Sequence, residues 1–252
     1  MRRTRVIPTL LLQDSGLVKT EKFKNAKYVG DPINAIKIFN KKEIDELVFL
    51  DIQASRLNKE PDYELIREFA SEAFFPIAYG GGIKNIDQAK KILRIGIEKV
   101  VISSSALTNP KLITEIAEYA GSSSVVICVD VKRTLFKGHK VISKDINNSI
   151  SDDPAKLIKE LVIRGAGEII LHSIDREGTY TGYDLELITK ISKIVDVPLV
   201  ALGGARGIDD FKMAVKHGAS AVAAGNLFIY FGKHRAVLIT YPNEIELEKN
   251  LI

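Results

Sequence analysis

Eight short runs rich in β-branched and aliphatic residues recur along the chain, and stretches in which apolar residues repeat with helical periodicity separate them. The runs span residues 6–12, 46–52, 76–79, 99–103, 124–131, 168–172, 199–202 and 219–224. The helical patterns span residues 32–40, 63–73, 86–94, 110–119, 154–164, 184–194 and 209–216, and several open with Asp or Pro. Because strand and helix alternate throughout, the pattern predicts an α/β fold, a closed parallel (β/α)8 TIM barrel.

The placement of glycine separates this barrel from a doubly wound open sheet. An open sheet carries one glycine fingerprint after its first strand, whereas the glycines here follow the third and seventh runs. Two longer stretches, 12–31 and 132–151, show no regular pattern, and each follows a strand end. Active-site loops of barrels lie at these ends, so we expect both stretches to be irregular loops that cover a substrate.

The chain also repeats part of itself. The sequence PIAYGGGI at Pro76–Ile83 returns 122 positions later as PLVALGGA at Pro198–Ala205. At the same offset Gly82 matches Gly204, Asp87 matches Asp209, Gly96 matches Gly218 and Ser104 matches Asn226. A duplicated half-barrel explains this repeat. Glycine-rich strand ends expose backbone N–H groups that bind anions, so two copies predict two phosphate sites facing one cavity.

Composition fits one such barrel and narrows its partners. The 252 residues are 46% hydrophobic and 27% charged, enough for a single domain, 1–252, with a full core. The net charge of +4 comes from scattered Lys and Arg, which favours small anionic substrates over nucleic acid. No apolar stretch suits a membrane span or a secretion signal, and the single cysteine, Cys128, excludes an internal disulfide. We therefore expect a soluble cytoplasmic protein with a buried thiol.

Six motifs together resemble one known family over most of the chain. They are Gly-Asp-Pro at 30–32, DELVFLDI at 45–52, GGGI at 80–83, VDVKR at 129–133, SIDREGT at 173–179 and Gly-Tyr-Asp at 182–184. The set is similar to the cyclase subunit of imidazole glycerol phosphate synthase, usually called HisF. The resemblance implies a lyase barrel that receives ammonia from a separate HisH-like glutaminase at its N-terminal face. At the opposite face, ammonia serves to cleave and cyclise a ribonucleotide that carries two phosphates.

The resemblance also assigns residues to the site. Contacts to substrate and phosphate fall on Lys19, Gly82, Ser103, Ser104, Asp175, Gly178, Gly204, Gly225 and Asn226. A ring of four charges that gates the ammonia entrance falls on Arg5, Glu46, Lys99 and Glu168, each at the start of a strand. Without the resemblance, such a salt-bridged layer would read as a stabilising plug, and a lone Lys19 as exposed surface.

The match breaks at the catalytic residues. The family uses two Asp residues, at the ends of the first and fifth strands, and only the second is present, as Asp130. Leu11 occupies the other position, and losing a positioned acid/base costs roughly 10²- to 10⁴-fold in rate. Asp14 follows closely but reads as a turn residue. The family's substrate loop is replaced by SKDINNS at 143–149, so substrate recognition should differ.

These departures resemble a HisF-like paralogue associated with surface-polysaccharide (lipopolysaccharide) biosynthesis. There a glutaminase and the barrel supply ammonia for amidation of a nucleotide-linked N-acetyl sugar, with a sugar amidotransferase as a further partner. Three alternatives stay open: a histidine-biosynthesis cyclase in which Asp130 or Asp175 works alone, a non-catalytic conduit that activates its glutaminase, and a related sugar isomerase. Leu11 argues against the first and the last, and an isomerase needs no ammonia gate.

No metal or organic cofactor is predicted. The four histidines, His139, His172, His217 and His234, show no close ligand spacing, and His172 at a strand end reads as a cavity-lining or core residue. Cys128 lies in a strand run without the context of a nucleophile elbow. Glutamine hydrolysis must therefore take place on a partner.

Overall fold

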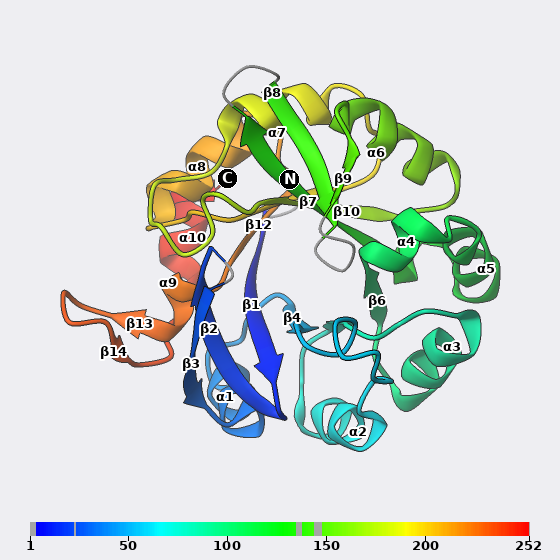
Figure 1. The fold of residues 1–252 in the computed structure, drawn as a ribbon. Helices are drawn as coiled ribbons and strands as arrows, with labels where there is room; N and C mark the ends of the chain where they lie inside the picture. Colours follow the sequence, from blue (N-terminus) through cyan, green and yellow to red (C-terminus); the bar gives the residue numbers. More distant parts are fainter. Residues whose placement is uncertain (1–3, 23, 135–137, 144–147, 252) are drawn as a thin grey trace.

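Eight parallel strands form a closed barrel, and helices surround it (Figure 1). The structure is a computed structural model that describes residues 4–22, 24–134, 138–143 and 148–251. The barrel strands are β1 (Arg5–Gln13), β4 (Leu47–Asp51), β5 (Ile77–Gly80), β6 (Lys99–Ile102), β7 (Val125–Thr134), β10 (Glu168–Ser173), β11 (Leu199–Leu202) and β12 (Ala221–Ala224). Pairing of β12 with β1 and of β10 with β7 closes the ring. The predicted TIM barrel is confirmed.

The outer helices include seven that lie within two residues of the predicted helical patterns, and a last one that was not predicted. They are α1 (Pro32–Asn40), α2 (Tyr63–Glu72), α3 (Ile86–Ile95), α5 (Lys111–Ala120), α6 (Pro154–Ile163), α7 (Leu185–Ser192), α8 (Ile208–Lys216) and α10 (Glu244–Leu251). Side chains of Asp31, Asp62, Asn85, Asp153 and Asp184 accept hydrogen bonds from backbone N–H groups of the first turns. Among the described residues, no helix has the length and apolar character that crossing a membrane requires.

Side chains alternate along each strand between two apolar layers. Outward side chains pack against the helices; the ring of Phe49 in β4, for example, stacks on Phe69 in α2 with centroids 4.2 Å apart. Inward side chains fill the lumen of the barrel with Ile7, Val48, Ala78, Val101, Val126, Cys128, Ile170, Val200, Leu202, Ala221 and Ala223. Successive side chains of a strand point to opposite faces of the sheet. Residues two positions before or after these therefore also face the lumen axis.

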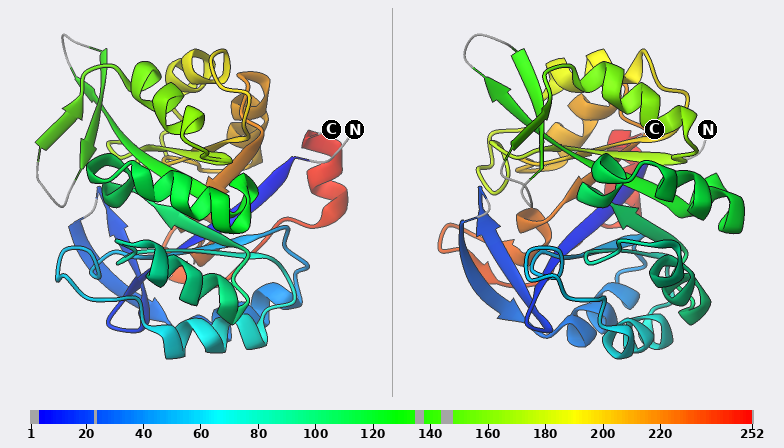
Figure 2. Two further views of the ribbon diagram at one scale, coloured as in Figure 1. Left: turned by 90° about the vertical axis from the view of Figure 1, so that its right-hand side faces the viewer. Right: turned by 45° about the vertical axis from the view of Figure 1, so that its right-hand side comes forward.

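Two antiparallel hairpins occupy the stretches predicted as irregular loops, so that prediction is wrong. β2 (Gly16–Glu21) and β3 (Lys24–Gly30) follow β1, and β8 (Gly138–Ser143) and β9 (Asn148–Ser151) follow β7. Figure 2 shows both on the side of the barrel away from the N-terminus. The residues of β3 are exposed except at its end, so this strand carries no alternating apolar pattern that would reveal it.

Matched positions of the internal repeat adopt matched structures. Gly96 ends α3 with φ of 116° and Gly218 follows α8 with φ of 105°. Ser104 begins the short helix α4 (Ser104–Thr108), and Asn226 begins the short helix α9 (Asn226–Ile229). The remaining short elements are a 3-10 turn at Ser122–Ser124 and the hairpin of β13 (Tyr230–Phe231) and β14 (Ala236–Val237). The duplication read from the sequence therefore extends to local conformation.

Candidate active site

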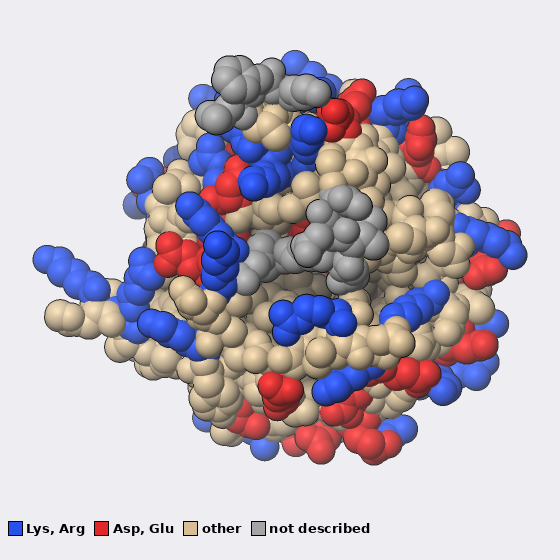
Figure 3. Space-filling model, viewed as in Figure 1, with Lys and Arg blue, Asp and Glu red and all other residues tan. Residues whose placement is uncertain are grey.

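A pocket opens toward the carboxyl ends of the barrel strands, and every barrel strand contributes at least one residue to its wall. The middle of the same face is surrounded by Lys and Arg side chains (Figure 3). Eight of the nine residues predicted to contact phosphate or substrate line this pocket: Lys19, Gly82, Ser103, Ser104, Gly178, Gly204, Gly225 and Asn226. Asp175 lies outside the lining, and its carboxylate accepts a hydrogen bond from the backbone N–H of Arg133 at 3.2 Å.

The two halves of the repeat meet in this pocket. Gly82 and Ser104 come from the first half, and Gly204 and Asn226 from the second. Gly82 has φ of 73°, and a Cβ there would lie 2.9 Å from the carbonyl oxygen of Lys59, so a side chain would be excluded. At this position, predicted to contact phosphate, the backbone N–H donates a hydrogen bond to Oγ of Ser55, another residue of the pocket wall, at 3.4 Å.

Lys19 is buried in the pocket wall, contrary to the reading of a lone lysine as exposed surface. Only 4% of the residue is exposed, and its Nζ donates a hydrogen bond to the carbonyl oxygen of Thr9 at 2.9 Å. A Cβ on Gly225 would lie 2.5 Å from this Nζ, so glycine makes room for the ammonium group. Burial lowers the pKa of Lys19 to about 8, although the charge of Glu177 acts in the opposite direction. A bound anion would raise this pKa again.

Leu11 and Asp130 face each other across the pocket. Their strands, β1 and β7, are four strands apart in either direction around the eight-stranded ring. Both side chains line the pocket, and Leu11 is 8% exposed. The wall opposite the Asp130 carboxylate is therefore apolar at the position where the family resemblance places a second carboxylate.

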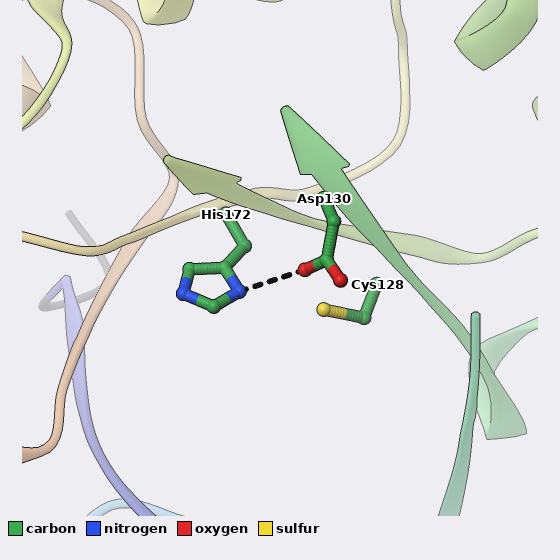
Figure 4. A group of neighbouring side chains, drawn as sticks. All are labelled: Cys128, Asp130 and His172. Carbon is green, nitrogen blue, oxygen red and sulfur yellow. Dashed lines mark hydrogen bonds and ion pairs between the residues drawn. The ribbon is translucent and has the colours of Figure 1, made fainter. Parts of the chain in front are cut away.

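His172 is the residue whose role sequence reasoning missed, although its place in the cavity wall is confirmed. It is the direct neighbour of Asp130 in the pairing of β10 with β7, and its Nδ1 lies 2.8 Å from Oδ1 of Asp130 (Figure 4). Cys128 precedes Asp130 by two positions, and donor atoms of the three residues all lie within 4.8 Å of one another. Ligand spacing along the chain could not reveal this cluster, because it forms only through strand pairing.

At the other end of the lumen lies the predicted ring of charges. Lys99 Nζ lies 2.8 Å from carboxylate oxygens of both Glu46 and Glu168, and Arg5 bonds the same two carboxylates, that of Glu168 at 3.1 Å. The Glu side chains are about 95% buried, with 5% and 6% exposed. Burial disfavours the guanidinium charge of Arg5, but Glu168 and Glu46 together raise its pKa above the usual value. Four alternating charges thus close a ring.

The ring is in register with the lumen. Arg5, Glu46, Lys99 and Glu168 each precede by two positions one of the lumen residues Ile7, Val48, Val101 and Ile170. All four charged side chains therefore point to the barrel axis. Along this axis the described residues give a charged ring, an apolar layer and then the pocket.

Comparisons with known proteins agree with this architecture. The family model described as histidine biosynthesis protein matches residues 5–235. A Pseudomonas aeruginosa protein with the provisional name imidazole glycerol phosphate synthase subunit hisF2 is 52% identical over 98% of this chain and 99% of its own length. A Vibrio vulnificus protein with the provisional name of subunit hisF3 is 50% identical over 100% of this chain and 97% of its own.

The imidazole glycerol phosphate synthase subunit HisF of Thermobifida fusca is 38% identical, over 91% of each chain. A match over nearly the whole barrel, together with relatives well above 30% identity, shows the family. This chain belongs to the histidine biosynthesis protein family and is a HisF-like subunit within it.

Proposed function

We propose that this chain is the ammonia-receiving barrel of a glutamine amidotransferase. A HisH-like glutaminase docks at the N-terminal face, ammonia enters through the ring, and it reacts with substrate in the pocket where Asp130 is the acid/base. One observation carries this proposal: the charged ring and the pocket lie at opposite ends of one lumen, whose described side chains between them form an apolar cluster. An apolar passage favours neutral ammonia over ammonium, because burying an unpaired charge is costly.

The substrate we propose is a nucleotide-linked N-acetyl sugar of surface-polysaccharide biosynthesis, amidated together with a sugar amidotransferase. Leu11 supports a substrate other than the cyclase ribonucleotide, because the apolar wall offers no second carboxylate. The glycine-lined wall and the buried Lys19 would hold the phosphate groups.

A second candidate is the histidine-biosynthesis cyclase itself. The observation that favours it is the retention of eight predicted phosphate and substrate contacts in one pocket. Leu11 distinguishes the two candidates. A cyclase with Leu11 would rely on Asp130 without a facing carboxylate, whereas the amidation proposal requires no carboxylate at position 11.

Cyclase turnover separates these candidates. We would supply ammonium and the ribonucleotide precursor of imidazole glycerol phosphate to wild type, Leu11→Asp and Leu11→Asn, the last being matched in size but unable to transfer a proton. We expect no turnover by wild type. Turnover on the order of 1 s⁻¹ by wild type would instead establish the cyclase. Gain of activity only in Leu11→Asp would show that the pocket still accepts the ribonucleotide and lacks the acid/base.

Amidation is tested directly on the complex with its glutaminase. The assay contains glutamine, ATP, the sugar amidotransferase and a panel of nucleotide-linked N-acetyl sugars. Mass spectrometry detects replacement of the oxygen of the N-acetyl amide by nitrogen. ATP is included because an amide oxygen is a poor leaving group. The proposal predicts a product that requires this chain and an intact Asp130. If Asp130→Asn forms product at the wild-type rate, the chain is a non-catalytic conduit.

A further inference from the structure

Asp130 and His172 form a fixed pair at the point where the lumen meets the pocket. They are in-register neighbours on β7 and β10, with 13% and 6% of their side chains exposed. The imidazole also lies close to the backbone of Gly203, where even a Cβ would lie 3.4 Å from its Cδ2. Strand pairing, burial and this packing together fix the hydrogen bond of 2.8 Å between Nδ1 and Oδ1.

The pair stands next to the apolar passage. Two positions before each member, Cys128 and Ile170 belong to the lumen cluster, and four positions before His172 lies Glu168 of the charged ring. Ammonia that follows this axis therefore leaves the apolar layer beside Asp130 and His172. No other strand places a described carboxylate and an imidazole within hydrogen-bond distance in the pocket lining.

Attack by ammonia creates a need for a base at this place. The nitrogen lone pair forms a bond to the electrophilic carbon of the substrate, and the π electrons of that carbon move to its attached heteroatom. The nitrogen then carries a positive charge, and one of its protons must leave to a nearby acceptor. A carboxylate serves best when it is ionised and held in one orientation.

We propose that His172 is the positioning residue for Asp130, standing in for the second carboxylate that position 11 lacks. Its Nδ1–H donates to Oδ1, keeps the carboxylate ionised and fixes its rotamer, so that Asp130 accepts the proton from the attacking nitrogen. This inference rests on the proposed function and names the residue on which the chemistry of that site depends. The histidine on the neighbouring strand thus completes the acid/base unit on one wall of the pocket.

A metal site is the competing use of the same side chains. Cys128, Asp130 and His172 offer sulfur, oxygen and nitrogen donors within 4.8 Å of one another. Donors on a tetrahedral zinc ion, bound at about 2.0–2.3 Å, lie about 3.3 Å or more apart. The 2.8 Å between Nδ1 and Oδ1 is the distance of a hydrogen bond and favours the pair.

The test compares two substitutions of His172 in the complex with glutaminase. In His172→Asn the amide N–H replaces Nδ1–H as donor, whereas His172→Leu fills similar space without a donor. We expect His172→Leu to lower kcat for amidation about 10²-fold with KM unchanged, and His172→Asn to recover to within about tenfold of wild type. The matched control is His217→Asn, at a partly exposed histidine that follows α8 and lies outside the pocket lining, which should leave kcat unchanged.

Two readouts do not depend on turnover. Nitrogen NMR of histidine-labelled protein should show His172 as the Nδ1–H tautomer, and Asp130→Leu should remove its hydrogen-bond shift. An Nε2–H tautomer overturns the inference. So does one equivalent of zinc in the purified protein that Cys128→Ser abolishes.

The kinetic outcomes separate the inference from the proposed function. An active wild type with an equally active His172→Leu overturns the positioning role alone. A wild type without product on every sugar overturns the proposed function and the positioning role with it. A rise of KM in His172→Leu at constant kcat would assign His172 to substrate binding instead.

Discussion

At the scale of single residues, Lys19 couples the pocket to the stability of the fold. Its pKa falls from 10.5 to about 8 on folding, so the unfolded chain binds more protons between these values. The free energy of unfolding therefore rises with pH from about 8 to 10.5, and below pH 8 the burial cost is fully present, about 3 kcal/mol at 1.36 kcal/mol per unit. From the sequence alone we would expect no such cost, because a lone lysine is typical of exposed surface.

We predict that Lys19→Met removes this dependence. The advantage of the variant over wild type in urea unfolding should shrink by up to about 3 kcal/mol between pH 8 and pH 10.5, as wild-type Lys19 loses its proton. Lys27→Met, at an exposed lysine of the same hairpin, is the control and should show a constant difference. A constant difference for Lys19→Met as well would mean that Lys19 is not held in a water-poor site.

Two positions of the candidate site show what the sequence could and could not predict. Asp130 and Leu11 were placed correctly in the pocket wall, because each lies late in the apolar run of its strand. His172 was placed there too, but its bond to Asp130 depends on which strands are neighbours and in what register. The two residues are 42 positions apart in the sequence, so no local pattern reveals their hydrogen bond, and only the structure shows the pair.

At the scale of elements, a buried hydrogen bond fastens the second hairpin to the start of α7. His139 of β8 places Nε2 2.9 Å from Oδ2 of Asp184, which also caps α7 by accepting from the N–H of Leu187. Burial raises the pKa of Asp184, but the bonds from His139 and Leu187 outweigh it and lower the pKa below its usual value. The carboxylate is thus stabilised in its charged form inside the protein.

Removing the donor should loosen this hairpin. We predict that His139→Leu lowers the free energy of unfolding by about 1–3 kcal/mol and speeds hydrogen exchange in β8 and in the first turn of α7. In His139→Gln the amide nitrogen replaces Nε2 as donor and should keep most of the protection. Equal exchange in all three proteins would show that strand pairing with β7 alone holds β8 in place.

The strands of these hairpins could not be predicted from the sequence pattern, whereas most of the helices could. Helix bounds fell within two residues of prediction, because amphipathic periodicity and Asp or Asn caps act locally. β3 is exposed along most of its length and pairs with β2, and the buried face of β8 consists of His139, Val141 and Ser143, of which only Val141 is apolar. Where an element has no alternating apolar face, its sequence carries little information about it.

At the scale of the whole molecule, closing the barrel joins two sites that lie far apart along each strand. Alternate residues of β10 point to the barrel axis. On this single strand Glu168 lies in the charged ring, Ile170 in the lumen and His172 in the pocket. The ring itself was predictable from strand starts and the family resemblance. Its closed alternation, two cations each shared by two buried carboxylates, required the structure.

Lys99→Met tests whether this ring is a passage or a plug. Loss of the cation leaves Glu46 and Glu168 with one partner fewer in a buried layer, and breaking such a pair costs about 3–5 kcal/mol. If the ring conducts ammonia, activity with glutamine should fall at least about tenfold, an added barrier of ~1.4 kcal/mol, while activity with free ammonium stays near wild type. Ammonium in solution reaches the pocket from its open side and bypasses the ring.

The Lys99→Arg variant is the matched control, since it keeps the charge and should preserve glutamine-dependent activity better than methionine. A plug would behave differently, because a loss of stability acts on the pocket whatever the source of nitrogen. Glutamine-dependent and ammonium-dependent rates would then fall together, in proportion to the fraction of unfolded protein. The ratio of the two rates, measured at a temperature where urea unfolding shows each variant to be folded, therefore decides what the ring does.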